Sequence, residues 1–134
     1  MKLFALPLAL LVVTVAAPSA GAATDGGFCS VARGVGRDLA SVTSLGRRPN
    51  VKASYLRIAT AEPALNASAP RSLKPHLRPI FSFVNLLIAD FDKVGWQPAG
   101  MAQYFPKLLP RAEAVTPHLH VVDAYLKGTC KLGT

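Results

Sequence analysis

The chain has 134 residues, a formal net charge of +8 at pH 7, two cysteines and an aromatic content of only 7%. This length suits one domain, and a core poor in aromatic residues favours packed helices over sheets. The charge does not indicate nucleic-acid binding, because the basic residues are not interleaved with the aromatic side chains on which bases stack.

The first residues have the order of a cleavable secretory signal peptide. A basic residue precedes an uncharged apolar segment, residues 3–17, and small residues follow it. Ala20-Gly21-Ala22 offers an A-x-A site, so we expect residues 1–22 to be removed by cleavage after Ala22 or Ala23. The apolar segment is shorter than the roughly 20 residues that span a bilayer, although anchorage through an uncleaved segment is the alternative. The sequence thus predicts a secreted, extracytoplasmic protein without a transmembrane anchor after cleavage, with one helical domain over residues 23–134.

The two cysteines, Cys29 and Cys130, lie near the two ends of the mature chain. An even number of cysteines in an oxidising compartment indicates a disulfide. Two free thiols or a redox pair are the alternatives, but the residues are far apart in sequence and form no C-x-x-C motif. We expect a bridge, which in the chain-entropy model stabilises the fold by about 4.7 kcal/mol for a loop of about 100 residues.

Apolar residues recur at steps of three and four after Phe28, which predicts a first helix over about residues 28–44. On this helix Ala32, Gly36 and Ala40 form a stripe of small residues that would let another helix approach closely. A turn over residues 46–50 is expected to follow.

A second helix is expected over about residues 50–61, with Asn50 as its N-cap. Pro63 is expected to close it, because the residue before a proline disfavours the helical conformation. Residues 63–72 would then be a connection, and the sequon that begins at Asn66 is too short a pattern to carry weight.

The strongest periodic signal runs from Leu73 to Phe91 and predicts a third helix that is apolar almost all round after Pro79, as expected of the most buried element. Pro79 is expected to kink this helix or to mark its true start. Gly95 is a stop signal, and Trp96 is expected to fold back over the helix. A turn is expected over residues 96–100.

The same spacing predicts a fourth helix over about residues 106–127, which ends at Gly128 just before Cys130. Four helices with apolar faces predict an all-α protein, a four-helix bundle that a disulfide between the ends of the mature chain closes.

Positive charge is concentrated in the first half of the mature chain. Residues 24–80 hold nine basic residues against three acidic ones, and the second half is nearly neutral. Such a surface is attracted to lipid headgroups, wall polymers or acidic proteins, which makes an anionic cell-surface component or a lipid the expected partner. The alternative is that the charge only keeps the domain soluble.

No catalytic motif is present, so we expect no enzyme activity. The alternative is an enzyme of unrecognised type, with a pocket that gathers His118 or His120 with Asp90 or Asp92. Asp90 and Asp92 are the only close carboxylates, and the expectation for them is two solvated charges near the edge of a helix. His118 and His120 would diverge by about 200° on a helix, so we expect no metal site from them. No cofactor is expected either.

Haem remains open as an alternative ligand, because tyrosine and histidine are usual axial ligands. The candidate ligands are Tyr104, Tyr125, His118 and His120, and the sequence holds no C-x-x-C-H motif.

The two ends of the chain carry a resemblance. Residues 28–31 (FCSV), which open the first helix, and residues 121–130 (VVDAYLKGTC), which close the last, resemble a pattern of small exported actinobacterial proteins with a cysteine after the signal peptide and a tail V-x-A-Y-x-x-x-x-C. The resemblance implies a helical fold with a terminal disulfide and carries no activity with it. The general layout is also similar to that of exported mycobacterial haemophore-like proteins, without a matching haem-ligand motif.

Together these observations predict an exported, non-enzymatic binding or interaction module with a basic surface. The alternative from another class is a carrier that holds haem or another lipophilic ligand in the core of the bundle. The oligomeric state does not follow from the sequence.

Overall fold

The computed structural model describes the backbone of residues 20–44 and 51–132 and the side chains of residues 27–43 and 51–132. Most of the predicted signal peptide, the turn over residues 46–50 and the predicted cap at Asn50 lie outside the described residues. The elements, in chain order, are helix α1 (Ala20–Ala40), the 3₁₀ helix η1 (Val42–Ser44), α2 (Val51–Ser68), α3 (Lys74–Lys93), the 3₁₀ helix η2 (Pro98–Tyr104) and α4 (Phe105–Gly128).

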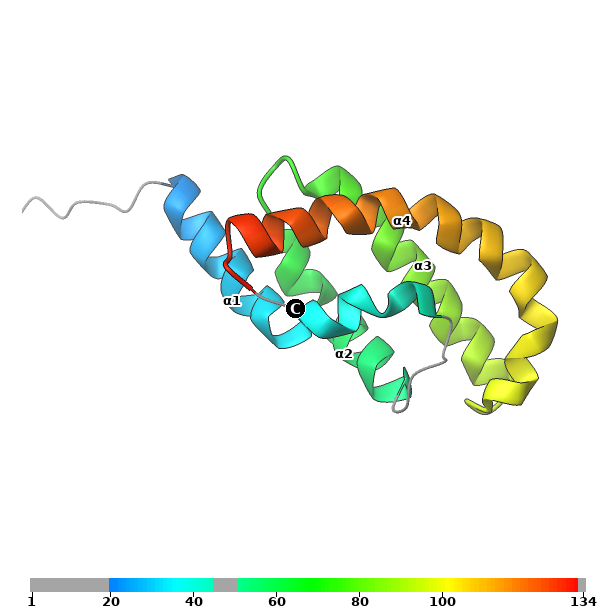
Figure 1. Ribbon diagram of the computed structural model, residues 1–134. Helices are drawn as coiled ribbons and strands as arrows, with labels where there is room; N and C mark the ends of the chain where they lie inside the picture. The colour runs from blue at the N-terminus through cyan, green and yellow to red at the C-terminus, as the bar shows by residue number, and fades with distance from the viewer. Residues whose placement is uncertain (1–19, 45–50, 133–134) are drawn as a thin grey trace, which may run out of the picture.

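The four α-helices pack against one another, which confirms the all-α bundle (Figure 1). Helix α1 lies against α2 and α4, and α3 lies against the same two helices from the other side. Helices α3 and α4 run in opposite directions and are joined at one end by η2. Of these four helix pairs, α1 and α4 meet least extensively. No helix in the described part of the chain is both long enough and apolar enough to cross a bilayer.

Helix α3 is the most buried element, as its periodicity predicts. Its apolar positions at steps of three and four are almost completely shielded from solvent, and each such side chain stabilises the fold by about 1.5–3 kcal/mol relative to an exposed one. They are Leu77, Ile80, Val84, Leu87 and Phe91. A proline in the first turn is tolerated there, because the first amide groups of a helix have no partner within it.

Helix α2 departs from the prediction, because it continues through Pro63 and ends at Ser68. A proline inside a helix removes one hydrogen bond and costs about 3 kcal/mol. The extra turns bury Leu65 completely, and the amide of Ala69 then donates to the Leu65 carbonyl. Burial of these residues offsets the cost, so the expected connection over residues 63–72 shortens to a few residues.

Two further boundaries differ from the expectations. Helix α1 begins at Ala20, upstream of the predicted cleavage window, and gives way to η1 after Ala40. The segment expected to be a turn over residues 96–100 continues into the 3₁₀ helix η2.

The structure confirms the disulfide between Cys29 and Cys130, whose Cα atoms lie 5.3 Å apart. It joins α1 to the second residue after the end of α4. Phe28 packs edge-on against Tyr125 beside it, with ring centroids 5.7 Å apart. The bridge therefore sits on an apolar contact that itself holds the two chain ends together.

The return of Trp96 onto α3 is confirmed as well. Its ring stacks on Phe91 with centroids 4.9 Å apart, and its indole N–H donates to the Asp92 carboxylate at 2.7 Å. The turn needs positive φ at both Gly95 and Trp96, so the glycine stop signal has a conformational reason.

Candidate functional site

A groove of about 280 Å³ opens between α1, η1 and α4. The predicted close approach along the small-residue stripe of α1 occurs only in part: Ala32 is fully buried, whereas Ala40 is exposed and a Cβ added to Gly36 would meet no atom of the described residues within 4 Å. The two helices are held together near the disulfide and leave open space further along α1. That space is the groove.

The groove has an apolar floor. Leu39 from α1 and Val122 and Leu126 from α4 are buried beneath it, and Leu119 is half-buried at its side. Polar atoms enter from Thr43, Thr116 and His120 and from the ion pair between Lys127 and Asp123, whose Nζ and Oδ2 atoms lie 2.8 Å apart. An apolar surface with a few convergent polar groups is the usual composition of a small-molecule site.

A second hollow continues the groove over the outer face of α1, and both are lined by Gly36, Ala40, Asp123 and Leu126. Five lysine or arginine side chains, one histidine and two carboxylates line the two hollows. Both carboxylates are already paired, Asp38 with Arg57 and Asp123 with Lys127. The cations that line the second hollow without an ion pair to any described residue are Arg33, Arg37 and Lys131. All three are exposed.

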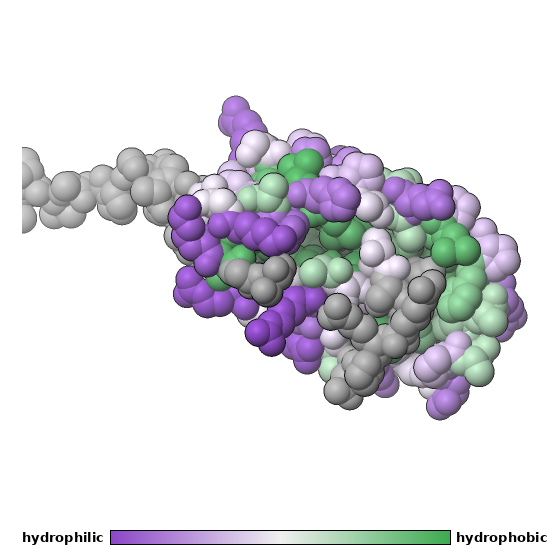
Figure 2. All heavy atoms as spheres, in the orientation of Figure 1, coloured by the Kyte–Doolittle hydropathy of each residue, from purple (hydrophilic) through white to green (hydrophobic). Residues whose placement is uncertain are grey.

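The division into polar and apolar regions is visible on the surface. Figure 2 shows hydrophilic side chains gathered over α1 and the end of α4, with hydrophobic side chains between them. The site is therefore apolar at its floor and positively charged at its rim.

Asp38 and Arg57 fix the wall of this site where α1 meets α2. Arg57 donates two hydrogen bonds to the carboxylate, from Nε at 2.9 Å and from Nη2 at 2.8 Å. Burial of Asp38 would by itself raise its pKa, but the hydrogen bonds from Arg57 and Ser54 and the charge of Arg57 outweigh it, so the pKa lies below its usual value. Asp38 thus stays charged, and it does not add a free negative charge to the rim.

The three histidines do not form one cluster. His120 lines the groove toward α1, whereas His118 faces the other way, toward α3, and its Nδ1 lies 3.0 Å from the Nδ1 of His76. The divergence of His118 and His120 follows from their helical spacing and is confirmed. The pairing of His118 with His76, 42 residues earlier, has no local signal in the sequence.

The expectation for Asp90 is wrong, because its side chain is almost completely buried. Asp90 shares a helix face with Phe83 and Leu87, and that face is covered by η2 and α4. The ammonium groups of Lys93 and Lys107 approach its two carboxylate oxygens at 3.4 and 3.6 Å. Its Oδ2 accepts no hydrogen bond from any described residue. Asp92 is exposed, as expected, and holds the indole of Trp96.

The four candidate haem ligands are spread over the molecule. Tyr104 lies under the ammonium groups of Lys93 and Lys107, Tyr125 packs on Phe28, and His118 faces His76. Of the four, His120 is the one that lines the groove. The described side chains therefore do not bring two of these ligands to one haem position.

Comparisons of this chain with protein-family models, with curated proteins and with solved structures gave no match. The case for a function therefore depends on the groove itself. The groove was not predicted from the sequence. The one signal for it was a pair of glycines, Gly34 and Gly36, within the predicted first helix.

Proposed function

We propose that this protein is an exported, non-enzymatic binding module that holds an anionic lipid in the groove between α1 and α4. The observation that supports the proposal is an apolar floor beside three cations that have no acidic partner among the described residues. An acyl chain on the floor removes apolar surface from water at about 25 cal/mol per Å². A phosphate group at the rim meets Arg33 and Arg37, whose guanidinium groups suit it.

Export is part of the proposal and has its own support. The order of the N-terminal residues is that of a signal peptide, and the disulfide is of a kind that persists in oxidising compartments. Outside the cytoplasm, a small basic domain meets the anionic lipids of a cell surface at short range.

Binding of single lipid molecules tests the proposal directly. We expect the mature chain, with its disulfide formed, to bind lysophosphatidylglycerol with one-to-one stoichiometry below the micelle concentration. Affinity should exceed that for lysophosphatidylcholine by about tenfold at low salt, a difference of about 1.4 kcal/mol, and this preference should shrink as salt screens the rim. Isothermal titration calorimetry and native mass spectrometry measure both quantities.

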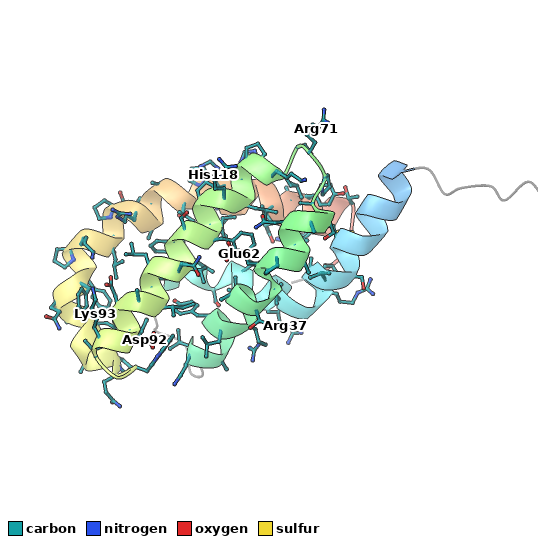
Figure 3. All side chains as sticks on the ribbon, turned by 180° about the vertical axis from the view of Figure 1, so that it is seen from behind. Arg37, Glu62, Arg71, Asp92, Lys93 and His118 are labelled. Carbon is teal, nitrogen blue, oxygen red and sulfur yellow. A yellow bond between two sulfur atoms is a disulfide. The ribbon has the colours of Figure 1, made fainter. Side chains whose placement is uncertain are left out.

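Two pairs of variants distinguish the contribution of the charged rim to binding from that of the apolar floor. The double variant Arg33→Glu/Arg37→Glu should lose the preference for the anionic lipid, whereas Arg71→Glu/Arg78→Glu, with the same net charge, should keep it. Arg71 is a suitable control because it points away from the bundle between α2 and α3 (Figure 3). Gly36→Leu should obstruct the groove and weaken both lipids, while Gly36→Ala should bind as the parent does.

Equal affinity for the two lipids, or equal losses in the two charge-reversal variants, would contradict the proposal. Haem is the other outcome of this test, since it also joins an apolar body to anionic groups. A Soret band that appears with haem and disappears in His120→Ala would support the carrier alternative, with haem in this groove rather than in the bundle core.

A further inference from the structure

His76 and His118 form a pair that neither the groove nor the core packing uses. His76 lies in the first turn of α3 and His118 near the middle of α4, and Figure 3 shows His118 beside the start of α3. Both side chains are half-buried, and their Nδ1 atoms lie 3.0 Å apart with ring centroids at 5.2 Å. Solvent therefore reaches the pair, and each ring turns a nitrogen toward the other.

The packing of α3 against α4 fixes the contact between these two rings. Leu77 and Ile80 follow His76 on α3, Val115 and Val122 flank His118 on α4, and all four are buried in the shared core. A shift of either helix that separated the rings would expose those side chains. The pair is thus held in register by the bundle rather than by its own contact.

The spacing matches that of two ligands on one metal ion. Imidazole nitrogens bind divalent ions at about 2.0–2.1 Å, so two nitrogens 3.0 Å apart subtend an angle of about 94° at a shared ion. An angle near 90° is that of adjacent positions in the square-planar and tetragonal sites of Cu(II).

We propose that His76 and His118 bind one Cu(II) ion through their Nδ1 atoms and so join α3 to α4, with solvent in the remaining coordination positions. The described residues include no group of three or more metal-ligating side chains, so the protein supplies two ligands and leaves the site open. Each ring carries its proton on Nε2 when Nδ1 binds the ion, and the broad χ2 torsion of histidine lets each ring turn toward it.

From the sequence alone, the histidine pair considered as metal ligands was His118 and His120. Neighbours two positions apart on a helix, His118 and His120, diverge, and that argument against a metal site still holds for them. His120 lies on the groove side of the same helix and is exposed. It is therefore a matched control, a histidine two residues away that cannot share an ion with His76.

The test is Cu(II) binding to the mature, disulfide-bonded chain and to three variants: His76→Gln, His118→Gln and His120→Gln. We expect one Cu(II) per chain with an electron paramagnetic resonance signal that shows two imidazole nitrogens. His76→Gln and His118→Gln should each weaken binding by at least about tenfold and remove one nitrogen from the signal, whereas His120→Gln should change neither. Zn(II) should bind more weakly than Cu(II), as the stability order of divalent ions requires.

A second measurement does not depend on how the variants fold. In the unchanged protein, Cu(II) added well below one equivalent should broaden the ring resonances of His76 and His118 before those of His120. Equal broadening of all three rings, or equal losses in all three variants, would overturn the proposal and leave the pair as a contact between two rings.

Discussion

At the scale of single residues, the contact between Asp38 and Arg57 is the ion pair with the best geometry in the described part of the chain. Its two hydrogen bonds, at 2.8 and 2.9 Å, match the fork of the guanidinium to the carboxylate. Asp38 is buried, whereas about half of the Arg57 side chain is exposed. The pair joins α1 to α2 at the wall of the second hollow, so its charge state bears on both stability and binding.

The pKa of Asp38 predicts how stability depends on pH. This pKa is lower in the folded chain than in the unfolded one, so the unfolded state takes up a proton first as the pH falls. The stabilisation is therefore complete above the unfolded value of about 3.9 and is lost as the pH falls through the folded pKa. In urea denaturation, Arg57→Gln should lower the free energy of unfolding at pH 6, and this deficit should shrink toward pH 2. A deficit that stays constant with pH would contradict the assignment, and Arg71→Gln is the control that should show none.

The buried carboxylate of Asp90 makes a second prediction at this scale. Removal of both lysines, in Lys93→Ala/Lys107→Ala, leaves a buried charge without a partner and should cost about 2 kcal/mol, less than a fully buried pair because both ammonium groups are half-exposed. Addition of Asp90→Asn to that variant removes the charge and should recover most of the loss. Urea denaturation of the complete cycle measures the coupling, and additive effects would show that the lysines do not stabilise Asp90.

These residue contacts mark where prediction from the sequence stops. Asp38 and Arg57 are 19 residues apart, and His76 and His118 are 42 apart. Helical periodicity assigns each residue to a face of its own helix but does not say which faces meet. The burial of Asp90 was missed for a related reason, because the residues that cover it belong to η2 and α4. The groove also depends on which helix faces meet. The sequence therefore placed residues on the faces of α1 and α4 but did not predict a groove between them.

At the scale of elements, two open glycines predict effects of opposite sign. A Cβ added to Gly34 or to Gly95 would meet no atom within 4 Å in the part of the chain that the structure describes, so we expect no crowding at either position. Gly34 lies within α1, where alanine is favoured by about 1 kcal/mol. Gly95 has a φ of 61°, a conformation that costs an L-residue about 1–2 kcal/mol. Thermal denaturation should therefore show a higher melting temperature for Gly34→Ala and a lower one for Gly95→Ala. Shifts in the same direction would contradict this account.

The helices differ in how well the sequence predicts them. For α3 and α4, periodicity and stop signals agree with each other, and the observed bounds lie within about two residues of the predicted ones. The predicted second helix was too short because Pro63 was expected to end it. The burial of Leu65, which offsets the cost of the proline, arises only in the packed bundle. The start of α1 was missed because glycines and small residues there give no apolar period.

At the scale of the whole molecule, the disulfide closes a bundle in which α1 and α4 meet less extensively than the other three packed helix pairs do. Cys29 and Cys130 are 101 residues apart in sequence, so the bridge closes a long loop in the unfolded chain. In the folded state the same ends are already held by Phe28 against Tyr125 and by the shared core. The bridge should therefore act mainly on the unfolded state, and the native arrangement of α1 and α4 should survive its loss.

That distinction gives the last prediction. Cys29→Ser/Cys130→Ser should lower the free energy of unfolding by about 4 kcal/mol, because the unfolded chain regains the entropy of a loop of about 100 residues. Under conditions where the variant remains folded, its amide NMR spectrum should match that of the parent except near the two substitutions. Urea denaturation, with and without a reductant acting on the parent, measures the first effect. If the spectrum instead changes along Gly36, Leu39 and Leu126, the bridge holds the groove in shape, and its stabilisation belongs to the folded state rather than to the unfolded one.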